Sequence, residues 1–308
     1  MRTSLLFLLI VPLALQAQVD RWVTNTCEKG SGAGIYAWST GDIYQGQCQN
    51  QRIHGHGTLQ RANGDRYVGL WRNDRHHGQG TYLWFSGDRY EGQWQNGMQW
   101  GSGTLARASG DRYTGQWRSG RKDGQGSLVL ANGDRYEGEW IDDRITGTGV
   151  YAWANGDHYE GHWLNGIRSG YGEFVGANGD RYQGDFLNDQ RHGQGTYQWA
   201  NGDTYWGSWL KGRQDGRGAK TWTNGDRYEG QMKAGRLEGS GHFTWADGKR
   251  YEGSFAADAP HGEGTYFWPN GVRFEGSWRN GQRHGPGSLV YANGDRVEQV
   301  YEEGRLVD

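Results

Sequence analysis

Proline, methionine and cysteine are scarce in this 308-residue chain, with 4, 3 and 2 residues, and lysine and arginine never form a basic run. Without such a cluster, and with a formal net charge of −2, a polybasic surface for nucleic acid or anionic membranes is excluded. Beyond the N-terminal segment, no apolar 3.6-residue period continues for ten residues without a glycine, which excludes ordinary helices. A disordered chain is excluded as well, because 17 Trp and 18 Tyr require burial.

Glycine is abundant, with 56 residues, and it recurs at fixed places in a 23-residue repeat. The segment Asn132–Trp140, with the sequence NGDRYEGEW, shows the pattern most clearly. Its tyrosine returns without insertion or deletion at Tyr44, Tyr67, Tyr90, Tyr113, Tyr136, Tyr159, Tyr182, Tyr205, Tyr228 and Tyr251, and then as Phe274 and Val297. Such regularity indicates repeats that dock on one another in one geometry.

Each repeat predicts two β-strands. Residues 136–140 alternate apolar or glycine with acidic residues, which is typical of a strand with one face in water, and residues 150–153 form the second strand. Asp142-Asp143 and Asn155-Gly156 are residue pairs that favour tight turns. We therefore predict an all-β fold, an elongated single antiparallel sheet of stacked β-hairpins with two strands per repeat.

A Gly-x-Gly motif opens the second strand of every repeat, as in Gly147 and Gly149. Both glycines share the parity of the aromatic residues, so they are expected to lie on the same face of the sheet. A side chain there would obstruct rings from the neighbouring strand. The sequence thus predicts rings packed over glycines.

The two ends depart from the repeat. Residues 1–17 combine Arg2, an apolar stretch and a small-residue exit at Ala17, which is the pattern of a cleaved signal peptide. An uncleaved hydrophobic anchor is the alternative. Residues 18–43 and 297–308 are half repeats that we interpret as caps on the sheet edges. The expected localisation is exported, either periplasmic or secreted.

Both cysteines, Cys27 and Cys48, lie at the N-terminal edge of the array. In an exported protein such a pair predicts a disulfide. Two buried free thiols are the alternative.

The repeat at Tyr136–Trp140, followed by its turn and Gly-x-Gly, resembles the MORN (membrane occupation and recognition nexus) repeat. The resemblance covers about residues 20–301, with eleven repeats over residues 44–296. It implies a sheet of stacked hairpins with a groove, used as a scaffold for partner proteins or for membrane association. MORN arrays also accompany lipid kinase domains, but no such domain fits outside the array, so we expect no enzymatic activity.

Candidate chemical groups are all repeated. The histidines His54, His77, His192, His261 and His284 share one place in the repeat, about 10 Å apart, which is too far to share a metal. The Asp-Arg pairs, such as Asp134-Arg135, are interpreted as turn residues whose arginines offset neighbouring carboxylates. We therefore predict no catalytic residues, no cofactor and no metal.

One row of tryptophans at the end of the second strand is either core or the lining of a groove. Its candidate binding residues are Trp153, Trp199, Trp222, Trp245 and Trp268. Since Arg61, Arg107, Leu130 and Gly176 interrupt the row, a groove would be most aromatic toward the C-terminal half. The function hypothesis is an exported, non-catalytic scaffold that binds a protein partner; the alternative is binding of membrane lipid or envelope polymer. No nucleic-acid partner is expected, and side-by-side association of two copies is a further partner class.

Overall fold

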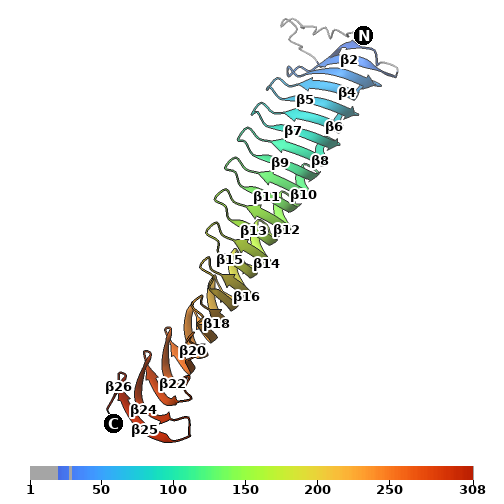
Figure 1. The fold of residues 1–308 in the computed structure, drawn as a ribbon. Coiled ribbons are helices and arrows are strands. Elements are labelled where there is room, and N and C mark those ends of the chain that lie inside the picture. The colour runs from blue at the N-terminus through green and yellow to red at the C-terminus, as the bar shows by residue number, and fades with distance from the viewer. Residues whose placement is uncertain (1–19, 28–29, 308) are drawn as a thin grey trace, which may run out of the picture. The chain divides into compact units, whose positions relative to one another are not determined.

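The computed structural model describes residues 20–27 and 30–307. These residues form 26 β-strands and no helix, and they therefore include no membrane-spanning helix. The predicted fold class is confirmed, with antiparallel hairpins and two strands per repeat (Figure 1). The predicted signal peptide lies outside the described residues. The chain divides into an N-terminal half, residues 1–144, and a C-terminal half, residues 145–308.

In the N-terminal half, strands of seven residues alternate with strands of nine after an irregular start. They are β1 (Arg21–Asn25), β2 (Ser31–Ala37), β3 (Ile43–Gln49), β4 (Arg52–Gln60), β5 (Arg66–Arg72), β6 (Arg75–Leu83), β7 (Arg89–Gln95), β8 (Met98–Ala106), β9 (Arg112–Arg118), β10 (Arg121–Val129) and β11 (Arg135–Ile141).

The C-terminal half continues the same alternation. Its strands are β12 (Arg144–Ala152), β13 (His158–Leu164), β14 (Ile167–Val175), β15 (Arg181–Leu187), β16 (Gln190–Gln198), β17 (Thr204–Leu210), β18 (Arg213–Thr221), β19 (Arg227–Lys233), β20 (Arg236–Thr244), β21 (Arg250–Ala256), β22 (Ala259–Phe267), β23 (Arg273–Arg279), β24 (Gln282–Val290), β25 (Arg296–Glu302) and β26 (Arg305–Leu306).

Within each half, successive strands pair in antiparallel order, with closely similar register from repeat to repeat. In β5 and β6, Tyr67 lies opposite Tyr82 and Gly69 opposite Gly80, and a bulge follows before Trp71 meets His76. The same bulge recurs at Gly161/Trp163 and Gly253/Phe255. A side chain at one place in the repeat therefore points to the same face of the sheet in every copy.

The core is a layer of aromatic rings on one face, which we call the inner face. Tyr67 is fully buried and its hydroxyl donates to the Leu70 carbonyl at 2.9 Å. The Trp71 ring lies edge-on to Tyr67 at 5.0 Å and to Tyr44 of the preceding repeat at 5.5 Å. Its indole N–H donates to the Gly57 carbonyl at 3.3 Å. Because each tryptophan joins two tyrosines, the rings connect consecutive repeats.

The two glycines of the Gly-x-Gly motif have different roles, which corrects the sequence interpretation. A Cβ at the second glycine, Gly80, would lie 2.5 Å from Cζ of Tyr67, so this glycine leaves room for the ring as predicted. The first glycine, Gly78, has φ +61° at the bulge, and a Cβ there would instead meet Leu70 at 2.8 Å. Its main constraint is a left-handed backbone, which the sequence pattern did not reveal.

The predicted turns are present, but the second one is longer than expected. Asp142 and Asp143 have φ of +47° and +68° in the turn between strands. Strand β12 ends at Ala152, so Trp153 belongs to the loop and not to the strand. The Trp153 N–H donates to the Asp157 carbonyl at 2.9 Å, which closes the loop.

Candidate binding face

Two rows of side chains cover the inner face beside the core. The second-strand row includes Tyr36, Leu59, Tyr82, Leu105, Tyr151, Tyr197, Lys220, Phe243 and Tyr266. The loop row includes Trp38, Arg61, Trp84, Arg107, Leu130, Trp153, Gly176, Trp199, Trp222, Trp245 and Trp268. All five candidate tryptophans, Trp153, Trp199, Trp222, Trp245 and Trp268, are half-buried, so each ring is neither enclosed core nor free.

In the C-terminal half the rings of these rows contact one another. Trp222 lies 5.4 Å from Phe243, Phe243 lies 4.6 Å from Trp245, and Trp245 lies 5.4 Å from Tyr266. Tyr266 in turn lies 4.7 Å from Trp268. This part of the face is the most aromatic, as the sequence indicated, and its rings fill much of the space between themselves.

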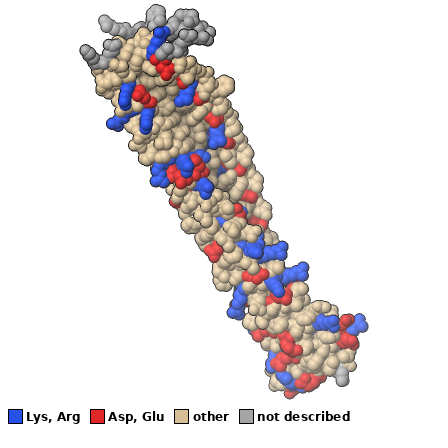
Figure 2. Space-filling view, turned by 180° about the vertical axis from the view of Figure 1, so that it is seen from behind, with Lys and Arg blue, Asp and Glu red and all other residues tan. Residues whose placement is uncertain are grey.

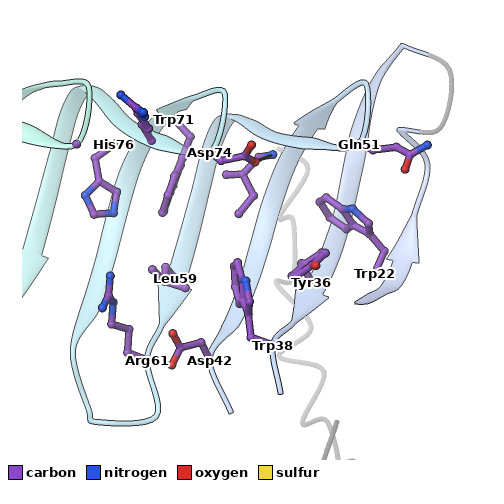
Figure 3. Close-up of a pocket in the computed structure, with 13 residues that line it drawn as sticks. Trp22, Tyr36, Trp38, Asp42, Gln51, Leu59, Arg61, Trp71, Asp74 and His76 are labelled. Atoms are coloured by element: carbon purple, nitrogen blue, oxygen red, sulfur yellow. Dashed lines mark hydrogen bonds between the residues drawn. The ribbon is translucent and has the colours of Figure 1, made fainter. Parts of the chain in front are cut away.

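In the N-terminal half the rows are interrupted, and hollows open at the interruptions. A hollow of ≈ 640 Å³ is lined by Trp38, Leu59 and Arg61, and a second of ≈ 540 Å³ by Trp84, Leu105 and Arg107. Figure 3 shows Trp38 and Arg61 along one edge of the first hollow, with Trp71 and His76 along the other. The arginines that appeared to break the aromatic groove therefore line its open part.

The carboxylates in these hollows accept hydrogen bonds from the backbone. Asp42 accepts the Ala62 N–H at 2.9 Å, and Asp74 accepts the Ile53 N–H at 2.8 Å. By contrast, Arg61 and Arg107 are exposed, and no described carboxylate lies within ion-pair distance of either guanidinium. Each hollow thus contains an arginine that can meet a ligand.

Sequence reasoning missed a row of polar side chains that stack on the core rings. It lies opposite the core tryptophans and carries His76, Lys122, Arg168, Arg191 and Arg283. His76 stacks on Tyr67 at 3.8 Å, and burial lowers the pKa of His76 to about 4, with a smaller contribution from nearby Arg61. Arg191 lies over Trp209 at 4.6 Å, and Lys122 over Trp140 at 4.7 Å. The sequence could have indicated this row, because its members all pair with the core aromatic position across a hairpin, where a cation favours cation–π contact.

The Asp-Arg pairs connect repeats differently from the prediction. Asp65 accepts the Phe85 N–H and the Tyr82 hydroxyl of the next repeat, both at 2.9 Å, so it satisfies a turn amide as expected but in the neighbouring loop. These hydrogen bonds hold the pKa of Asp65 below its usual range, and the bond from the Phe85 N–H has the largest effect. Some of the arginines instead pair with outer-face glutamates, as Arg89 does with Glu91 at 2.7 Å. Arg181 likewise pairs with Glu173.

Cys27 and Cys48 form a disulfide with a Cα–Cα distance of 5.8 Å. Cys48 occupies the place of the core tryptophan, and both cysteines are buried. The bond ties the segment after β1 to β3 at the sheet edge.

The described residues contain no group of three or more His, Cys, Asp and Glu placed to bind a metal ion. The Nδ1 atoms of His54 and His77 are buried without a hydrogen-bond partner, but these histidines lie in adjacent repeats, about 10 Å apart, which is too far to share a metal. Charges of both signs are interspersed on the face shown in Figure 2.

The family model of the MORN repeat matches eleven consecutive segments, 44–66, 67–89, 90–112, 113–135, 136–158, 159–181, 182–204, 205–227, 228–250, 251–273 and 274–296. These segments make up most of the chain. The chain belongs to the MORN-repeat family. Most of its inner face is thus built from MORN repeats, including the second hollow, whereas part of the lining of the first hollow, such as Trp38 and Asp42, precedes residue 44.

Two solved structures illustrate the remote similarity of the MORN array to other sheets. One is the TCP domain of Drosophila melanogaster SAS-4 in complex with a proline-rich motif of Ana2, which is 16% identical in sequence. The alignment covers 57% of this chain and 97% of the SAS-4 domain, with a TM-score of 0.33. The TCP10 domain of Danio rerio CPAP is 10% identical, with coverages of 79% and 99% and a TM-score of 0.23. At such scores the similarity supports no inference about this chain. No curated protein matches the sequence.

Proposed function

We propose that this MORN array is a non-catalytic scaffold that binds a protein partner along its inner face. The observation that carries the proposal is the combination of half-buried rings with two hollows on one face of a regular meander. Aromatic rings offer a large contact area with little side-chain entropy to lose, and concave surfaces bury more of a ligand than flat ones. The repeated backbone hydrogen bonds hold these groups in place before a partner arrives.

Crosslinking capture from the native host tests this function. Trp84→Ala on the inner face should reduce recovery of the partner at least several-fold. Trp206→Ala is the matched control, because Trp206 is 62% exposed and has the opposite parity to buried Tyr205 in β17. Equal recovery with both variants, or no reproducible partner, would contradict the proposal.

A second function, binding of membrane lipid or envelope polymer, is favoured by the ring stack from Trp222 to Trp268. Such a stack suits a sugar ring or an acyl chain. Sedimentation with liposomes and with cell-wall material separates this function from the first. Changing Trp222, Trp245 and Trp268 to Ala should abolish retention, and unchanged retention in a folded variant would reject the stack as the binding surface.

We further propose that the protein is exported. The disulfide supports this proposal, because such bonds persist mainly in oxidising compartments. N-terminal sequencing of the protein recovered from the envelope or medium should show cleavage after Ala17. Recovery of the intact chain from the cytosol with two free thiols would contradict export.

We also propose that two copies associate side by side through a row of exposed leucines on the outer face of the C-terminal half. Leu164, Leu187 and Leu210 occupy one place in successive repeats and are 57%, 47% and 46% exposed. Equal spacing lets this stripe meet a two-fold related copy of itself. Sedimentation velocity should show a dimer that Leu187→Lys weakens, and a monomer at all concentrations would exclude it.

A further inference from the structure

On the inner face of the N-terminal half, two kinds of side chain alternate from one repeat to the next. Tyr36 and Trp38 are followed by Leu59 and Arg61, then by Tyr82 and Trp84, and then by Leu105 and Arg107. Adjacent repeats are two strands apart, which is about 9.6 Å, so one full alternation measures about 19 Å. A matching ligand presents an apolar group and an anionic group in turn at this spacing.

The contacts of these residues show what each repeat offers. The Trp38 ring packs against Tyr36 at 4.7 Å and the Trp84 ring against Tyr82 at 4.6 Å, and both tryptophans remain half-buried. In the intervening repeats, leucine replaces the tyrosine and arginine the tryptophan. Because leucine is smaller than tyrosine, a hollow remains beside Leu59, and the exposed Arg61 guanidinium lines it (Figure 3).

Among regular peptide conformations, polyproline II matches the spacing best. It has three residues per turn and rises about 3.1 Å per residue, so equivalent side chains recur every 9.3 Å or so. Seven residues of α-helix span about 10.5 Å, which puts a helix out of register by nearly 3 Å after three repeats. In a β-strand, side chains on one face recur about every 6.8 Å, so three such intervals come close to two repeats, but the residue midway between them points to the opposite face and cannot meet the repeat in between.

We propose that the inner face of the N-terminal half binds an acidic, proline-rich segment in the polyproline II conformation. Prolines at every sixth residue pack on Trp38 and Trp84, and Asp or Glu residues midway between them pair with Arg61 and Arg107. The proposal rests on the scaffold function above and names the chemistry of its partner. The spacing is the same for either direction of the peptide.

Each hollow is lined by two carboxylates and two cations, so an acidic ligand is favoured by which of these groups are already bound and not by a net positive charge. Asp42 and Asp88 accept backbone N–H groups of the following loops at 2.9 and 2.8 Å, and Asp74 and Asp143 accept those of strand residues. Arg75 and Lys122 line the same hollows and add positive charge. An acidic residue that enters can pair with the exposed guanidinium of Arg61 or Arg107, which has no ion-pair partner among the described residues, whereas each native carboxylate already accepts a backbone N–H.

A fluorescence anisotropy titration of the full-length protein with synthetic peptides tests the proposal. The test peptide has twelve residues, with Pro at its first and seventh places and Glu at its fourth and tenth. Two further peptides replace each Glu with Gln or move each Glu by one residue. Arg61→Gln with Arg107→Gln should weaken binding of the test peptide at least tenfold. The matched control, Arg66→Gln with Arg112→Gln, changes exposed outer-face arginines in strands β5 and β9 and should leave binding unchanged.

Equal binding of the test peptide and either altered peptide would overturn the proposal. Retention on phosphatidylglycerol vesicles that depends on Arg61 and Arg107, without peptide binding, would assign the alternation to a lipid surface and overturn it too. The scaffold function is tested separately: partner capture that depends on Trp84, without peptide binding, refutes only the polyproline ligand. Peptide binding without a captured partner refutes only the scaffold function.

Discussion

At the scale of single residues, the second glycine of each Gly-x-Gly motif limits how closely the strands and rings can approach. Gly80 lies against the Tyr67 ring, and Tyr67 is fully buried, so an added methyl group has no space. We expect Gly80→Ala to lower the free energy of unfolding by about 1–3 kcal/mol, the range for overpacking a core. Urea denaturation measures this loss.

Gly97→Asp is the matched control for that measurement. Gly97 has φ +87° with no atom within 4 Å of an added Cβ, and Asp74 and Asp143 occupy the same place in other repeats with φ of +66° and +68°. This variant should stay within about 0.5 kcal/mol of the parent. If the two variants are equally stable, the ring does not exclude a side chain.

The turn aspartates predict a pH dependence of stability. Hydrogen bonds from the next repeat lower the pKa of Asp65, Asp111, Asp157, Asp180 and Asp203 below the usual 3.8. A lowered folded-state pKa contributes stability above the unfolded pKa, and that contribution is lost as pH falls through the folded pKa. The buried His76, whose pKa is lowered to about 4, adds a loss of stability as pH falls from about 6.5 to 4, because the unfolded chain binds this proton first. The urea midpoint should therefore begin to fall below about pH 6.5 and fall further below about pH 4, where the aspartates become protonated. A midpoint that rises over this acidic interval would contradict the inter-repeat bonds.

At the scale of the strand and its loop, the two tryptophans of a repeat contribute unequally. Trp209 is 5% exposed, donates to the Gly195 carbonyl at 3.1 Å and lies edge-on to Tyr182 and Tyr205, both at 5.3 Å. Trp153 is half-buried and packs mainly on Tyr151 at 4.5 Å. We expect Trp209→Ala to cost about 3–5 kcal/mol and Trp153→Ala about 1–2 kcal/mol. Chemical denaturation that gives equal losses would place Trp153 in the core.

The strands could be predicted from the sequence because the two-residue alternation and the turn residues recur in every repeat. Residues 136–140 carry the alternation, and positive φ at Asp142 and Asp143 follows from their tolerance of that conformation. The bulge before Trp71 was not visible, because the first glycine of the motif has the same parity as the second. The role of Arg61 was also missed, since a hollow depends on what neighbouring Leu59 and Trp38 leave unfilled.

At the scale of the whole molecule, many of the contacts that stabilise a repeat are made with the adjacent repeats. Tryptophan-to-tyrosine contacts and aspartate hydrogen bonds both reach one repeat away, as Trp71 does to Tyr44 and Asp65 to Phe85. Stability in such an array is approximately a sum of local and nearest-neighbour terms. A change at one edge should therefore affect that edge most.

The disulfide provides the test of this locality. Cys48 takes the place of a core tryptophan, so the first repeat has a covalent bond where the others have an aromatic ring or, in one repeat, Met232. Closing this loop contributes about 3 kcal/mol in the chain-entropy picture. Reduction should speed amide exchange in β1 and β2, because β1 is an edge strand that pairs only with β2. Amide exchange in β15–β18, which pair with one another far along the chain, should not change. Hydrogen exchange with and without reductant measures this, and a uniform loss of protection in both halves would show that the array unfolds as one cooperative unit.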